Sequence, residues 1–125
     1  MIPREFRLKH MKDFDILFKE GRFVGGSVIN LKYWQIKANK YPRRKYLKND
    51  LKIGFVVGLK VHKSAVKRNR VKRQMREVVR LLLKEDKLKQ GYMLALMAKP
   101  GIIGKDYKEI ESGVMEVLKK AGIFK

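Results

Sequence analysis

The chain has 125 residues and 45% of them are hydrophobic, so residues 1–125 can form a single domain without disulfides or a structural metal. The formal net charge of +20 at pH 7 costs stability through self-repulsion, which indicates an acidic partner such as nucleic acid or an anionic membrane. The absence of cysteine excludes disulfides, thiolate zinc sites and cysteine nucleophiles, and it fits a reducing cytoplasm.

A first helix is predicted from about Lys9 to Glu20, because Phe14, Leu17 and Phe18 recur at helical spacing. Gly21 follows directly and is expected to end this helix in a left-handed conformation. Two phenylalanines four residues apart on a helix are core residues by default.

The residues from Ser27 to Ile36 alternate between two faces, which is the period of a half-exposed strand. One face carries Ile29, Leu31 and Tyr33, and the other carries Asn30, Lys32 and Trp34. The second face can present polar groups to a ligand. The basic stretch from Ala38 to Asp50 comes next, and we predict a long mobile connection that supplies supplementary phosphate contacts.

The stretch from Ile53 to Leu59 is apolar on both faces, which predicts a central strand whose Gly54 and Gly58 permit close backbone approach. Ser64 is then placed as the N-cap of a basic helix that ends near Glu85. One arc of this helix is apolar and should anchor it in the core: Val71, Met75, Val78, Val79 and Leu82.

Tyr92 to Ala98 forms another apolar strand that stops at the turn Lys99-Pro100-Gly101. A final helix from about Tyr107 to Ala121 keeps one face apolar. The order is therefore α-β-β-α-β-α. A helix that links the two most buried strands implies a β-α-β unit with those strands parallel or nearly so. We predict a two-layer α/β sandwich.

The segment from Lys60 to Arg80 holds nine lysines and arginines and one acid, Glu77. Like charges three or four residues apart on a helix repel by a few tenths of a kcal/mol per pair, so this density calls for an anionic partner. Adsorption to lipid is disfavoured because the apolar stripe of this helix is better explained as core. The longest apolar run is far shorter than the ~20 residues that span a bilayer, and the N-terminus has no apolar signal region.

No protein active site is visible in the sequence. The histidines, His10 and His62, lack metal-ligand spacing, and the twelve acids form no paired motif. We therefore assign no catalytic residue and name no metal ligand.

One block begins with Gly54-Phe55-Val56-Val57 and continues as Ala65-Val66-Lys67-Arg68-Asn69-Arg70-Val71-Lys72-Arg73-Gln74-Met75-Arg76-Glu77. This block resembles the signature of the bacterial ribonuclease P protein subunit. The start of the chain, with Arg7-Leu8-Lys9, Asp13-Phe14, Phe18 and Lys19-Glu20-Gly21, resembles the first helix of that family. Ala98-Lys99-Pro100 resembles the end of its last strand. Two segments depart from the family pattern by being longer, the turn Val61 to Ser64 and the loop Ala38 to Asp50.

The resemblance implies a cytoplasmic accessory subunit of an endoribonuclease, which joins a large catalytic RNA and helps it remove the 5′ leader from precursor tRNA. The RNA would perform the hydrolysis, and Mg²⁺ would be held mainly by RNA phosphates, which this ion prefers as ligands. The resemblance also implies a left-handed crossover around the basic helix, against the usual right-handed preference.

Two sets of site residues follow from this resemblance. The catalytic RNA would contact Lys67, Arg68, Asn69, Arg70, Lys72, Arg73, Arg76 and Arg80. A cleft between the first helix and the sheet would hold the single-stranded leader, and Phe14 and Phe18 match its aromatic positions. To this cleft we add Lys32 and Trp34, because they lie on the polar face of the predicted strand. Stacking of a base on an aromatic ring is worth ~1–3 kcal/mol.

Two other classes of function stay open. A non-catalytic RNA-binding protein of ribosomal type would bind RNA without altering its cleavage. A DNA-binding regulator needs base-reading side chains and usually a dimer, whereas this helix offers mainly phosphate-binding groups, so we expect no DNA partner. We also expect no membrane partner, because the apolar stripe of this helix is explained as core.

Overall fold

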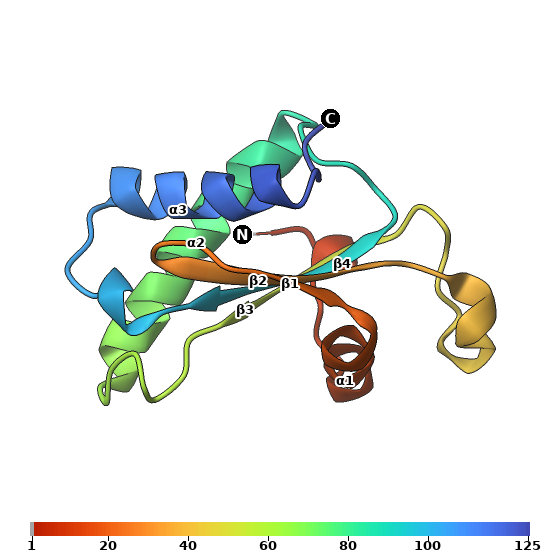
Figure 1. The fold of residues 1–125 in the computed structure, drawn as a ribbon, viewed down its shortest axis with the longest axis horizontal. Helices are drawn as coiled ribbons and strands as arrows, with labels where there is room; N and C mark the ends of the chain where they lie inside the picture. The colour runs from red at the N-terminus through yellow and green to blue at the C-terminus, as the bar shows by residue number, and fades with distance from the viewer. Residues whose placement is uncertain (1) are drawn as a thin grey trace.

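A four-stranded mixed sheet carries three α-helices in the computed structural model, which describes residues 2–125 (Figure 1). The strands are β1 (Arg22–Val24), β2 (Ile29–Gln35), β3 (Leu51–Val56) and β4 (Tyr92–Ala98). The helices are α1 (Met11–Glu20), α2 (Ala65–Lys84) and α3 (Tyr107–Lys120). Every predicted helix and strand is present, and the α/β class is confirmed. The short strand β1 is additional, because three residues carry no periodic pattern.

The sheet has the order β1-β2-β4-β3, with β3 parallel to β4 and the other neighbours antiparallel. The predicted parallel β-α-β unit is therefore confirmed for β3, α2 and β4. The predicted central position of β3 is wrong, because β3 is an edge strand and β4 is the inner one. The β3 sequence is apolar on both faces, like that of a central strand, because the N-terminal segment covers the outer edge of β3. There the Leu8 N–H donates to the Ile53 carbonyl at 3.0 Å.

Helices lie on both faces of the sheet (Figure 1). The predicted sandwich layer consists of α2 and α3 on one face, with Leu31, Leu94 and Met75 in its core. The predicted apolar arc of α2 is buried there in full. On the other face α1 forms a partial third layer, where Leu17 packs into the cluster that contains Met93.

Gly21 ends α1 for a reason other than the one its sequence position predicts. Its φ of −77° is not left-handed, so the predicted conformation is wrong. A Cβ at this position would lie 2.5 Å from the Leu17 carbonyl oxygen and 2.9 Å from that of Tyr33. Glycine is therefore required because the last turn of α1 meets the backbone of β2.

The segment between β2 and β3, for which the sequence predicts a long mobile connection, packs against α1. It contains two 3₁₀ turns, η2 (Ala38–Lys40) and η3 (Pro42–Arg44). The carboxylate of Asp13 accepts hydrogen bonds from the Arg44 guanidinium and from the Tyr46 hydroxyl. Local sequence could not show this, because the anchoring acids lie on α1, about 30 residues earlier.

Tyr46 should give this docking a dependence on alkaline pH. Burial and the hydrogen bond to Asp13 raise the pKa of Tyr46 from 10.0 to about 12. Because the folded pKa is the higher one, the stabilisation is complete below pH 10 and is lost as the pH rises towards 12. Chemical denaturation across this range should show a smaller loss of unfolding free energy for Tyr46→Phe than for the parent protein. Parallel pH profiles would contradict the assignment.

None of the helices in residues 2–125 combines the length and the apolar character that a bilayer span requires.

Candidate nucleic-acid interface

The outer side of α2 carries a continuous set of cations. Ser64 caps the helix by accepting from the Lys67 N–H at 3.4 Å, which starts the helix directly before the basic residues. The side chains that are exposed to solvent form what we call the α2 basic surface: Lys67, Asn69, Arg70, Arg73 and Arg76. Within residues 2–125 none of its four cations takes part in an ion pair, so their charges are free to meet phosphates.

The other three predicted RNA-binding residues are more enclosed. Arg68 donates through Nη1 to the carbonyls of His62 at 2.9 Å and Lys63 at 2.8 Å, which fixes the turn before α2. Arg80 forms a two-point ion pair with Glu77, with distances of 3.0 and 2.7 Å. This guanidinium lowers the pKa of Glu77, so the pair persists at neutral pH. Lys72 is half-buried.

Arg76 connects the α2 basic surface to the edge of the sheet. Its guanidinium carbon lies 5.9 Å from the centroid of the Phe55 ring, within the range of a cation–π contact. A pocket of about 400 Å³ opens beside it and continues to Phe14 of α1. The lining combines cations and apolar groups and includes Arg7, Leu8, Phe14, Ile53, Phe55 and Arg76.

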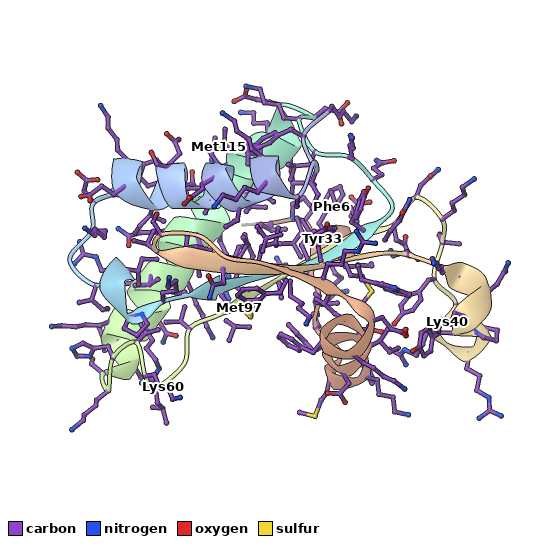
Figure 2. All side chains as sticks on the ribbon, in the orientation of Figure 1. Phe6, Tyr33, Lys40, Lys60, Met97 and Met115 are labelled. Atoms are coloured by element: carbon purple, nitrogen blue, oxygen red, sulfur yellow. The ribbon has the colours of Figure 1, made fainter. Side chains whose placement is uncertain are left out.

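The face of the sheet that α1 leaves partly uncovered forms a second candidate surface. Paired residues on neighbouring strands point to the same face, and the pairing places Phe23, Lys32, Ala95 and Gly54 in one row across all four strands. The next row contains Asn30, Met97 and Val56. We call the part of these rows that solvent reaches the open sheet face: Phe23, Asn30, Lys32, Val56 and Met97. Figure 2 shows Met97 on this side of the sheet, between α1 and the turn that carries Lys60.

Two aromatic rings of α1 border the open sheet face. Phe14 and Phe18 are stacked with a centroid distance of 6.4 Å, and Phe18 is 42% exposed. The Phe14 ring lies directly over Gly54, where a Cβ would be 2.6 Å from the ring. The predicted close approach is confirmed at Gly54 and wrong at Gly58, whose Cβ would meet no atom within 4 Å.

The four predicted cleft residues therefore separate into two groups. Lys32 is part of the open sheet face, and Phe14 and Phe18 border it. Trp34 is only 6% exposed, because Tyr41 and Tyr46 each pack edge-on against it with centroid distances of 5.9 Å. Sequence reasoning missed Phe23 and Met97. The alternation along β4 could have placed Met97, whereas nothing in the pattern of β1 marks Phe23.

The two histidines have structural roles. His10 accepts from the Lys12 N–H and caps α1, and His62 accepts from the Ser64 N–H in the turn before α2. Among residues 2–125 no three histidines or acids come together as a group that could hold a metal ion. The chain thus offers cations and aromatic rings at its surface, which are the groups that bind phosphates and stack on bases.

Comparison with known proteins points to one family. A family model described as Ribonuclease P matches residues 2–122. The chain is 36% identical over 121 residues to the ribonuclease P protein component of Clostridium botulinum (strain 657 / Type Ba4), covering 97% of this chain and 98% of that protein. It is 33% identical over 125 residues to the ribonuclease P protein component of Synechococcus sp. (strain JA-2-3B'a(2-13)), covering 98% of this chain and 86% of that protein.

Solved structures show the same fold. The RNase P protein of Staphylococcus aureus superposes with a TM-score of 0.77 at 21% identity, covering 96% of this chain and 98% of that one. The RNase P protein of Thermotoga maritima superposes with a TM-score of 0.72 at 20% identity, covering 91% and 96%. The mixed arrangement of four strands and three helices is thus shared at low sequence identity.

Proposed function

The chain belongs to the ribonuclease P protein family, and from this premise we propose that it binds the catalytic RNA of ribonuclease P and the 5′ leader of precursor tRNA. The protein acts in tRNA 5′ maturation as the accessory subunit of an endoribonuclease. One observation supports this most: the unpaired cations of α2 connect through Arg76 to a surface bordered by Phe14 and Phe18.

In this proposal the α2 basic surface holds the catalytic RNA. Each arginine that meets a phosphate releases condensed counterions, which drives binding without reading sequence. The Asn69 side chain adds a group that can donate to a phosphate and accept from a 2′-hydroxyl. Arg68 and Arg80 support this surface, since the first fixes the turn before α2 and the second is paired with Glu77. Lys72 completes the set from its half-buried position.

The open sheet face receives the leader. A single strand exposes unstacked bases, and the rings of Phe18 and Phe23, which are 42% and 59% exposed, offer surfaces on which such bases stack. Lys32 is the register partner of Phe23 and Asn30 lies two residues before it on β2, so both can provide polar contacts to the backbone of the leader. Trp34 contributes indirectly, because its ring packs against Tyr41 and Tyr46 of the segment between β2 and β3.

The chemistry is assigned to the RNA. Mg²⁺ prefers phosphate oxygens and retains most of its waters, so we place it mainly on RNA phosphates, where it would supply charge neutralisation and an activated water. The residues of this chain bind, orient and neutralise the two RNAs.

The deciding experiment is a reconstituted cleavage assay with the catalytic RNA encoded in the same genome. At low Mg²⁺ the protein should raise the rate of leader removal from precursor tRNA above that of the RNA alone. If the protein does not raise the cleavage rate of an RNA that is active by itself at high Mg²⁺, the proposal is refuted. A ribosomal type of RNA-binding protein, which the comparisons do not favour, would bind RNA and leave this rate unchanged.

Substitution of Gly54 tests the leader surface separately. Gly54→Ala should push the Phe14 ring off the sheet, because the new Cβ would lie 2.6 Å from it. Phe14 stacks on Phe18, so the Phe18 ring should shift with it, and the loss of this stacking position should weaken binding of precursor tRNA by the holoenzyme about tenfold. Binding of leaderless tRNA should not change. Gly58→Ala is the matched control, since its Cβ would occupy open space. Equal losses for both tRNAs would refute a leader-specific role for Phe14.

A further inference from the structure

The segment between β2 and β3 forms a basic platform that packs on α1. Glu20 accepts from the Tyr41 hydroxyl at 3.1 Å and pairs with Lys40 at 2.5 Å. Asp13 pairs with Arg44 at 2.9 Å. These contacts hold η2 and η3 against the side of α1, so the segment is presented as a fixed surface.

The platform keeps most of its charge after these contacts are made. Residues 37–48 contain six lysines and arginines and no acid. Lys40 and Arg44 are neutralised by acids of α1. The remaining four are exposed and, within residues 2–125, have no ion-pair partner: Lys37, Arg43, Lys45 and Lys48. Uncompensated cations that are gathered on one surface suit an anionic partner.

A pocket of about 470 Å³ lies between α1 and η3. Ile16, Tyr41 and Pro42 give it an apolar and aromatic part. Its charged lining consists of Lys12 and Arg43, which make no ion pair within residues 2–125, of the paired Lys40 and Arg44, and of the acid Asp15. A pocket that combines apolar and aromatic groups with cations matches a nucleotide, whose base is flat and apolar on its faces and whose phosphate is anionic.

The platform is separate from both surfaces already assigned. Figure 1 shows the segment between β2 and β3 at one end of the long axis of the molecule and the start of α2 at the other. Figure 2 shows the same separation through Lys40 and Lys60, with Met97 between them and on the far side of α1 from Lys40. The helix α1 therefore stands between the platform and the open sheet face.

We propose that this platform and its pocket form a second site for single-stranded RNA, which takes leader nucleotides beyond those on the open sheet face. The proposal rests on the proposed function. The leader is the partner because it is single-stranded and already lies against α1, whose full width is only about 10–12 Å. A strand that leaves the open sheet face and crosses α1 would reach the pocket that Lys12 and Arg43 line.

The test uses the reconstituted holoenzyme and precursor tRNAs whose leaders increase in length by one nucleotide at a time. The variant Lys12→Glu with Arg43→Glu reverses two unpaired charges at the pocket. Its matched control is Lys108→Glu with Lys119→Glu, which changes the net charge equally on α3, across the sheet from α1. Thermal unfolding of both variants verifies that they fold.

For short leaders the pocket variant and the control should bind equally. Beyond a threshold leader length the affinity of the parent holoenzyme for precursor tRNA should increase, and the control variant should show the same increase. The pocket variant should bind these long-leader substrates about tenfold more weakly than the parent. Equal weakening at every leader length would place another RNA segment at the platform and overturn the leader assignment. No difference from the control at any length would overturn the site itself. Cleavage of short-leader substrates, which tests the proposed function, is read independently.

Discussion

Replacement of Arg70, Arg73 and Arg76 together by alanine should weaken binding of the catalytic RNA about 100-fold near physiological salt. Each exposed guanidinium that contacts a phosphate contributes roughly 1 kcal/mol, and three such losses multiply to about this factor. The three side chains belong to the α2 basic surface and make no ion pair within residues 2–125, so their loss leaves no buried charge behind. Filter binding or fluorescence anisotropy with the protein in excess measures the effect.

The salt dependence separates phosphate contacts from other causes of weak binding. If the parent protein meets about six phosphates, log affinity should fall against log salt with a slope of magnitude ~5, and the triple variant should lose roughly 2 to 3 from that magnitude. Arg73→Ala alone should lose roughly one. The control removes three lysines outside this surface that make no ion pair in the described part of the chain, residues 2–125: Lys89, Lys108 and Lys119. An unchanged slope for the triple variant would show that these arginines do not contact phosphate.

The α2 basic surface could be predicted from sequence because the residues that determine it all lie within one helix. The apolar arc through Val71 and Met75 fixes which side of the helix is buried, and the exposed side follows from the helical period. Local sequence cannot tell which exposed cations are already engaged. The carbonyl partners of Arg68 come from the preceding turn, and that turn adopts its shape only in the folded chain.

The open sheet face could be predicted only in part because it depends on pairing between distant strands. Alternation in β2 placed Lys32 on the solvent side, but the neighbour of Lys32 on β1 is Phe23, and only the register shows it. Trp34 has the same alternation and is nevertheless buried, because Tyr41 and Tyr46 return over it from a later segment. Contacts between residues of distant segments produce no periodic pattern in the sequence, so they cannot be predicted from it.

Met75→Ala should lower the free energy of unfolding by about 3 kcal/mol, within the usual 2–5 for this change in a core. Met75 is fully buried between α2 and the sheet, so the substitution leaves a cavity that its neighbours fill only in part. Urea denaturation measures the loss. Val66→Ala, which shortens a side chain on the same helix that is 75% exposed, is the control and should change the stability by less than about 0.5 kcal/mol.

Met75→Leu keeps the volume and should cost less than about 1.5 kcal/mol, which separates the cavity from any specific need for methionine. The cavity leaves the outer face of α2 intact, so the folded fraction of Met75→Ala should bind the catalytic RNA with the parent affinity. Binding should then restore stability, because RNA at 100 times its dissociation constant adds about 2.7 kcal/mol to the folded state. A Met75→Ala protein that folds yet gains nothing from the RNA would show that Met75 also sets the orientation of the α2 basic surface.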